Sequence, residues 1–129
     1  MAKSAPRLLP ALAAVGALIA VAAGAFATHG LSDARAKDLL HIGGQYELTH
    51  ALAVFACLVV ARRGSELAGM CLLVGSTLFA WSLYALAFGA PRMVGVITPI
   101  GGLLMMAGWA ILAAAAMFGR PAAGEGLGD

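Results

Sequence analysis

Charged side chains are scarce in this sequence, where Asp, Glu, Lys and Arg together make up 11% of the 129 residues. Soluble globular proteins carry about 25% charged residues. So few charges cannot cover a surface that faces water, and 62% of the residues are hydrophobic. The composition therefore predicts an integral membrane protein whose main partner is the lipid bilayer.

Cysteines and clustered basic residues are also few. Cys57 and Cys71 stand among apolar neighbours and form no C-x-x-C motif. This arrangement excludes a disulfide framework and predicts two buried free thiols. Basic residues occur singly or in one pair, so we expect no nucleic-acid partner.

Motifs for catalysis are missing as well. The sequence shows no nucleophile–base pair, and Gly101-Gly102 lies in an apolar run without the Lys and the flanking strand of a phosphate-binding loop. We therefore expect this chain not to be an enzyme, and to hold neither a cofactor nor a metal ion.

What the sequence does contain is a series of long uncharged stretches. A bilayer core needs about 20 apolar residues of helix. Strands of a membrane barrel alternate over about ten residues, whereas these stretches are continuous and rich in the helix formers Ala and Leu. We predict an all-α, antiparallel up-down four-helix bundle in one domain (1–129), with membrane helices at about 8–28, 45–61, 67–88 and 95–118 and a flexible tail at 120–129.

The first stretch allows two interpretations. Ala25-Phe26-Ala27 resembles the cleavage site of a secretory signal peptide. Against this, the stretch is longer than the apolar core of about 7–15 residues in such peptides. Gly16, Ala20 and Gly24 also repeat at the four-residue spacing of closely packed membrane helices. We expect a retained helix, and the same packing role is predicted for Gly101, Gly102 and Gly108 in the last helix.

The segment between the first two spans predicts a short helix of its own. Ser32 can cap a helix over residues 33–42, and Gly43-Gly44 can end it. With Leu39 and Leu40 on one face, this helix is expected to lie on the membrane surface.

Antiparallel helices bring the polar residues of the spans to one end of the bundle. These residues form a candidate polar pocket: His29, Gln45, Tyr46, Glu47, His50, Ser82, Tyr84, Thr98 and Pro99. If the second span begins near Gln45, His50 lies about 7–8 Å below the membrane surface. We expect Glu47 or Tyr84 to satisfy His50 by a hydrogen bond, and Pro99 to bend the last helix.

Several interpretations of these polar residues remain open. They can join the helices, at about 0.6 kcal/mol per hydrogen bond. His29 and His50 could instead be axial haem ligands, and Glu47-Leu48-Thr49-His50 matches the Glu-x-x-His of di-iron bundles, although the other inward carboxylates are missing. Proton-coupled transport through Glu47 and His50 is a further alternative. Four-helix exporters place a carboxylate near the middle of the membrane, where none is expected here.

Four segments resemble the YgdD-like family of small bacterial inner-membrane proteins, which has a relative among animal transmembrane proteins. They are GAFATHGL (24–31), QYELTHALAV (45–54), WSLYALA (81–87) and VGVITPIGGLLMMAGW (94–109). The family usually has Gly-Ala-His where this chain has Ala27-Thr28-His29, and Tyr-Gln where it has Tyr46-Glu47. The resemblance implies four membrane helices and no established biochemical activity.

The sequence thus predicts a multi-pass protein of a bacterial inner membrane. Five basic residues at the end with the termini against three at the other end favour cytoplasmic termini. The expected role is an accessory or structural membrane component, alone, as a homo-oligomer or in a larger complex. The alternative is binding or translocation of a small solute, a lipid headgroup or a proton at the outward polar pocket.

Overall fold

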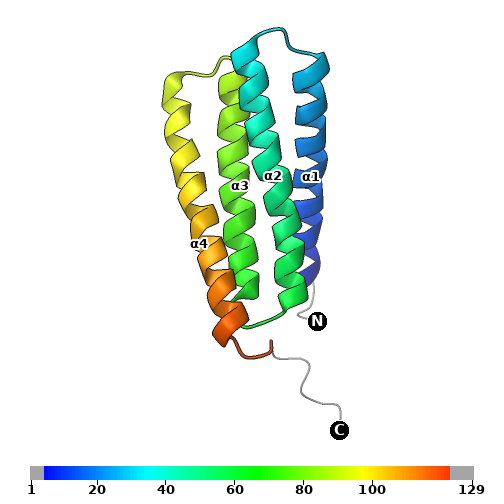
Figure 1. Ribbon diagram of the computed structural model, residues 1–129, viewed down its shortest axis with the longest axis vertical. Helices are drawn as coiled ribbons and strands as arrows, with labels where there is room; N and C mark the ends of the chain where they lie inside the picture. Colours follow the sequence, from blue (N-terminus) through cyan, green and yellow to red (C-terminus); the bar gives the residue numbers. More distant parts are fainter. Residues whose placement is uncertain (1–4, 123–129) are drawn as a thin grey trace.

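The structure is a computed structural model that describes residues 5–122 as four long helices (Figure 1). They are α1 (Ala5–His29), α2 (Ala34–Val60), α3 (Ser65–Ala87) and α4 (Ile97–Phe118), and a short 3₁₀ helix, η1 (Arg92–Val96), leads into α4. All four are long and apolar enough to cross a membrane. The predicted all-α, up-down membrane architecture is confirmed. We call the end with the α2–α3 turn the turn end, and the other end the loop end.

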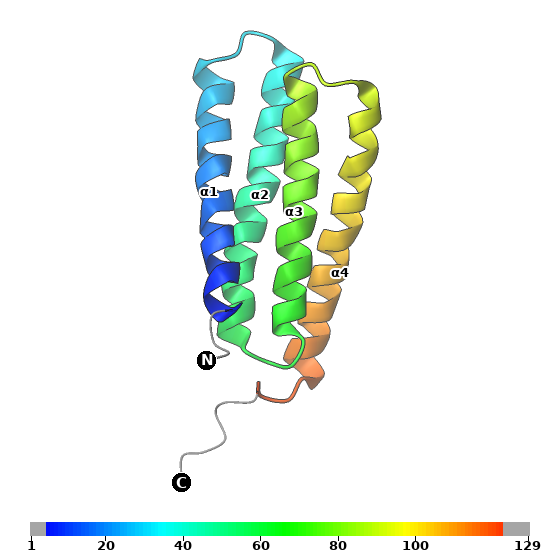
Figure 2. The same cartoon turned by 180° about the vertical axis from the view of Figure 1, so that it is seen from behind.

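The helices lie in a row, in the order of the chain (Figures 1 and 2). α2 packs between α1 and α3, and α3 packs between α2 and α4, while α1 and α4 share no contact within residues 5–122. α1 touches α3, and α2 touches α4, only lightly. The bundle therefore presents a lengthwise groove between α1 and α3 over α2, while α2 and α4 lie on either side of α3.

The beginning of α2 corrects the prediction of a separate surface helix. Residues 34–42 are the first turns of α2, which continues without a break through Gly43 and Gly44. Asp33, not Ser32, caps the helix, because its side chain accepts the Ala36 N–H at 2.8 Å.

The two glycines have a packing role instead. A Cβ on Gly43 would lie 2.7 Å from the Tyr84 ring, and a Cβ on Gly44 would lie 3.1 Å from the Ala20 carbonyl oxygen. Gly43-Gly44 therefore marks a close approach of α3 and α1 to α2, rather than the end of a helix.

The small residues predicted to pack the helices fall into two groups. Gly101 and Gly108 face α3, where a Cβ on Gly101 would lie 2.5 Å from the Gly75 carbonyl oxygen. Gly16 and Ala20 face α2. Gly24 and Gly102 do not lie at such contacts, since a Cβ on either would meet nothing within 4 Å.

The hydrophobic core lies toward the turn end of the bundle. Each helix contributes to it, with Leu9, Val54, Leu72 and Leu112 among its buried members. Cys57 belongs to this core and is 1% exposed, and Cys71 is partly buried; both are free thiols.

The residues after α4 are tied to the α2–α3 turn. Arg63 donates its backbone N–H to the Arg120 carbonyl at 2.9 Å, and Ala122 donates to the Ala61 carbonyl at 3.1 Å. The sequence predicts a flexible tail that begins at residue 120. In the structure, these hydrogen bonds hold residues 120–122 against the α2–α3 turn. Residues 123–129 lie outside the described part of the chain.

Candidate functional site

Glu47 lies at the middle of the bundle's length rather than near one end. It stands midway between Ala34 and Val60, about 20 Å from either end of α2 at the rise of an α-helix. On α1 it faces Gly16, which is near the middle of that helix's uncharged run. The expected depth was shallower because a span beginning at residue 45 leaves out the first turns of α2. The structure therefore places a carboxylate midway along the length of α2, where the sequence was expected to have none.

The Glu47 carboxylate accepts two hydrogen bonds from α3. The Tyr84 hydroxyl donates to Oε2 at 2.7 Å, and the Trp81 indole N–H donates to Oε1 at 3.2 Å. Glu47 is 2% exposed, and a Cβ on Gly16 would lie 3.7 Å from Oε1, so α1 closes the third side. Both donors are neutral, and the described residues provide no cationic partner for this carboxylate.

A hollow in the α1–α3 groove opens beside this carboxylate. Its volume is about 350 Å³, and Glu47 contributes the one ionisable group of its lining. Its other lining residues are Leu12, Val15, Gly16 and Ile19 from α1, and Leu73, Val74, Thr77, Leu78 and Trp81 from α3. A second hollow of about 280 Å³ continues toward the loop end and shares Ile19. The groove thus offers an apolar surface of small-molecule size around one carboxylate.

His50 points toward α4. Its Nδ1 lies 2.7 Å from the Tyr46 carbonyl oxygen, and its Nε2 lies 3.1 Å from the Trp109 indole nitrogen. A carbonyl only accepts and an indole N–H only donates, so these partners assign the neutral tautomer with the proton on Nδ1. The expected bond from Glu47 or Tyr84 to His50 does not form, because those two residues bind each other instead.

Aromatic rings surround His50. The Tyr46 ring stacks on the imidazole, with ring centroids 5.9 Å apart and an interplanar angle of 7°. The ring centroids of Tyr46 and Phe79 of α3 are 4.6 Å apart. Trp109 meets His50 edge-on, with ring centroids 6.0 Å apart. His50 is 6% exposed, so this cluster is a packed contact between α2, α3 and α4.

Ser82 and Thr98 form a third polar contact, between α3 and α4. Their hydroxyl oxygens are 2.6 Å apart, and Ser82 also donates to the Phe79 carbonyl. Pro99 follows Thr98 as the third residue of α4, where a helical N–H has no partner within the helix. Pro99 therefore sits in the first turn of α4, directly after η1, and the bend expected at this residue stays a prediction.

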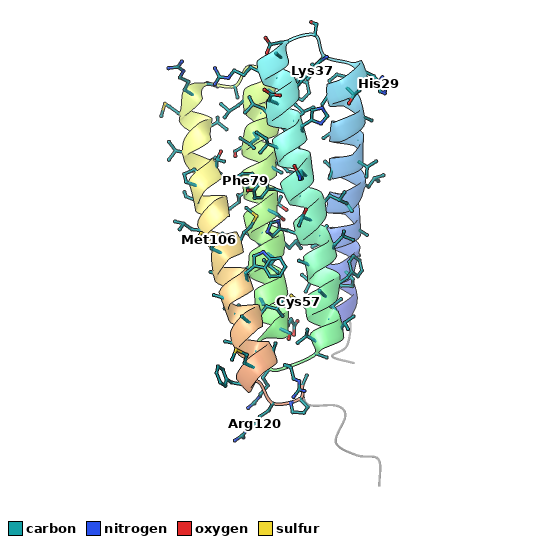
Figure 3. The ribbon with its side chains drawn as sticks, viewed as in Figure 1. His29, Lys37, Cys57, Phe79, Met106 and Arg120 are labelled. Carbon is teal, nitrogen blue, oxygen red and sulfur yellow. The ribbon has the colours of Figure 1, made fainter. Side chains whose placement is uncertain are left out.

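The remaining predicted pocket residues do not join these contacts. His29 is the last residue of α1 and is exposed, at the same end as Lys37 and well away from Phe79 (Figure 3). Gln45 is also exposed. The predicted single cluster is therefore three separate contacts, with His29 and Gln45 outside them.

The haem and di-iron interpretations do not fit this geometry. His29 and His50 do not face each other, and both ring nitrogens of His50 already have partners. Glu47 and His50 bind different helices. Within residues 5–122, no group of three or more His, Cys, Asp and Glu side chains could hold a metal ion.

Trp81 and Trp109 are the functional-site candidates that the sequence reasoning missed. An indole N–H inside an apolar helix needs a hydrogen-bond acceptor. In this sequence, the polar side chains of the second span are the candidate acceptors. This signal could have linked α4 to His50, but it could not have selected His50 over Glu47.

Comparison with known proteins identifies the family of this chain. A family model described as "Protein of unknown function (DUF423)" matches residues 23–102. A UPF0382 membrane protein of Haemophilus influenzae is 43% identical over 108 residues, which are 79% of this chain and 87% of that protein. The Bacillus subtilis UPF0382 membrane protein YwdK is 36% identical over 82% of this chain and 93% of its own length.

A further relative carries a name that states its membrane. The Escherichia coli K12 UPF0382 inner membrane protein YgdD is 34% identical over 82% of this chain and 86% of its own length. No solved structure matches this chain.

Proposed function

This chain belongs to the DUF423 family of membrane proteins, and from its structure we propose that it binds a membrane-soluble small molecule in the α1–α3 groove beside Glu47. The observation that carries this proposal is the position of the Glu47 carboxylate. It is buried midway along α2, and it lines an apolar hollow of about 350 Å³.

Energies favour a functional carboxylate over one that only joins the helices. Inserting a charged side chain at the centre of a membrane helix costs about 2.5–3.5 kcal/mol. Two interhelical hydrogen bonds at an average of about 0.6 kcal/mol recover less than half of that. Hydroxyl pairs such as Ser82 and Thr98 join helices without this cost. For the ionised form, the position of Glu47 therefore favours a further role.

The proposed setting is a bacterial inner membrane with both termini in the cytoplasm. The relative YgdD is named an inner membrane protein. Arg62, Arg63 and Arg120 belong to the turn end, at which α1 begins and α4 ends, and two further basic residues precede α1's apolar run. Arg35, Lys37 and Arg92 stand at the loop end, so the excess of positive charge favours a cytoplasmic turn end.

Native mass spectrometry tests the proposed binding. We expect the protein released from mild detergent to retain a small-molecule adduct, and Thr77→Trp to lose it, because the larger side chain fills the groove beside Glu47. Ala113→Trp is the control, since this position is exposed on α4 outside that lining. Identical spectra without adducts, together with no thermal stabilisation of the parent by a panel of membrane-soluble compounds, would rule the proposal out.

The second candidate is an accessory or structural component of a membrane assembly. It is favoured by a specific observation: in the described part of the chain, every buried side-chain nitrogen or oxygen has a hydrogen-bond partner. Such a bundle needs no ligand to be complete. Co-purification in mild detergent tests this candidate, with a stoichiometric second protein or a defined homo-oligomer as its expected result.

A further inference from the structure

We propose that the occupant of the α1–α3 groove is a lipophilic cation, such as a hydrophobic amine or quaternary ammonium compound, that competes with a proton for Glu47. This inference rests on the proposed function and names its ligand class. It is carried by the charge, the lining and the hydrogen bonds of one site.

Charge complementarity is the first argument. The groups facing the Glu47 carboxylate are the Tyr84 hydroxyl and the Trp81 indole from α3, while α1 presents Gly16 and no titratable group. On α2 itself, His50 is one turn further on, neutral and bound to Trp109. The ionised carboxylate is thus solvated by neutral donors alone, and a cation in the adjoining hollow would complete an ion pair. An anion would meet only repulsion there.

The lining of the hollow supplies the second argument. Leu12, Val15 and Ile19 face Leu73 and Leu78 across the groove, so the part of a ligand away from Glu47 would contact hydrocarbon side chains. Trp81 adds an aromatic ring at the edge of the same hollow. Aromatic faces attract cations, most strongly where water is excluded. This combination selects an apolar body that carries a positive charge.

The two hydrogen bonds of Glu47 divide its roles. The bond from Tyr84 is the shorter, at 2.7 Å against 3.2 Å from Trp81. Trp81 is 52% exposed, whereas Glu47 is 2% exposed. Oε1 accepts only the longer of the two bonds and keeps a free lone pair for a cation in the hollow, while Tyr84 holds Oε2 in place. Tyr84 is therefore a positioning residue, and Trp81 stands beside the oxygen that the cation would contact.

Competition with a proton follows from the low dielectric of the site. An ionised carboxylate without a cation is costly inside a membrane, and either a proton or a ligand cation removes the net charge. The two occupants exclude each other, because each neutralises the same group. Binding of one cation therefore releases one proton wherever the carboxyl is protonated beforehand.

Tetraphenylphosphonium and tetraphenylborate test this inference, because they share a shape and differ in the sign of the charge. We expect the full chain in detergent to bind the phosphonium at one saturable site by calorimetry, and not to bind the borate. Where the carboxyl is protonated, affinity should rise about tenfold per pH unit. Glu47→Gln should weaken binding at least about tenfold, and Glu66→Gln, the same change at the exposed start of α3, should not.

The outcomes separate this inference from the proposed function. If both ions bind alike, or if Glu47→Gln binds the phosphonium like the parent, the cation inference is wrong while a groove ligand survives. If binding of the phosphonium does not depend on pH, the inferred competition between the cation and a proton for Glu47 is wrong. If neither ion binds and no adduct depends on the groove, both proposals fail. Should Glu47→Gln not fold, Glu47→Asp replaces it, and we expect weaker binding that keeps the pH dependence.

Discussion

Glu47 and His50 stand one helical turn apart on α2, yet each accepts a hydrogen bond from a tryptophan of a different helix. Trp81 of α3 donates to Glu47, and Trp109 of α4 donates to His50. The row arrangement makes this possible, because the two faces of the row open between different pairs of helices. The carboxylate and the imidazole are therefore two sites, which separate variants can address.

Replacements of Glu47 should separate its charge from its hydrogen bonds. Glu47→Gln keeps an acceptor for Tyr84 and removes the charge, so we expect the free energy of unfolding to change by less than about 1 kcal/mol. Glu47→Ala leaves two buried donors unpaired and should lower it by about 1–3 kcal/mol. Reversible unfolding in mixed micelles measures both. Equal losses for the two variants would show that the hydrogen bonds contribute nothing.

The two tyrosines provide a matched comparison. Tyr84→Phe removes the donor at 2.7 Å from Glu47 and should lower the free energy of unfolding by about 1 kcal/mol. Tyr46→Phe removes a hydroxyl that makes no hydrogen bond in the described structure and keeps the ring stacked on His50, so its effect should be near zero. The same unfolding measurement compares them, and a larger loss for Tyr46→Phe would contradict the assigned roles.

The tautomer of His50 can be observed directly. Nitrogen-15 NMR of labelled protein should show a protonated Nδ1 and an unprotonated Nε2, because the Trp109 N–H must find an acceptor. Trp109→Phe should shift the Nε2 resonance, whereas Trp81→Phe should leave it unchanged, since Trp81 binds Glu47. A protonated Nε2 in the parent would disprove the contact with Trp109.

Two adjacent glycines of α4 should respond in opposite ways to alanine. A Cβ on Gly101 would come within 2.5 Å of the Gly75 carbonyl oxygen and 2.6 Å of the Phe79 amide nitrogen, so α3 and α4 would have to separate. We expect Gly101→Ala to destabilise the bundle by at least about 1–3 kcal/mol. Gly102→Ala meets nothing within 4 Å and should be neutral or up to about 1 kcal/mol more stable. Thermal unfolding measures the stability of both variants, and equal stability of the two would contradict this prediction.

The limit of sequence reasoning is clearest at the beginning of α2. Charges at Arg35, Lys37 and Asp38 next to Gly43-Gly44 are typical of a short surface helix that ends at the glycines. In the structure α1 and α3 pack against those glycines, and their lack of side chains allows the close approach. A single sequence cannot distinguish a Gly pair that ends a helix from a Gly pair that lets a neighbouring helix pack closely. The distinction depends on where the neighbouring helices lie.

The sequence by itself determined that this is an all-α membrane protein with four spanning helices. Hydrocarbon offers no partner to backbone N–H and C=O groups, so long uncharged runs have to form helices. Only the tertiary structure decided which polar side chains meet. Glu47 binds Tyr84 and Trp81, and His50 binds Trp109, because helix order, rotation and axial offset set those pairs. No one helix contains that information, since hydropathy reports burial in lipid and not the direction of a side chain toward its neighbours.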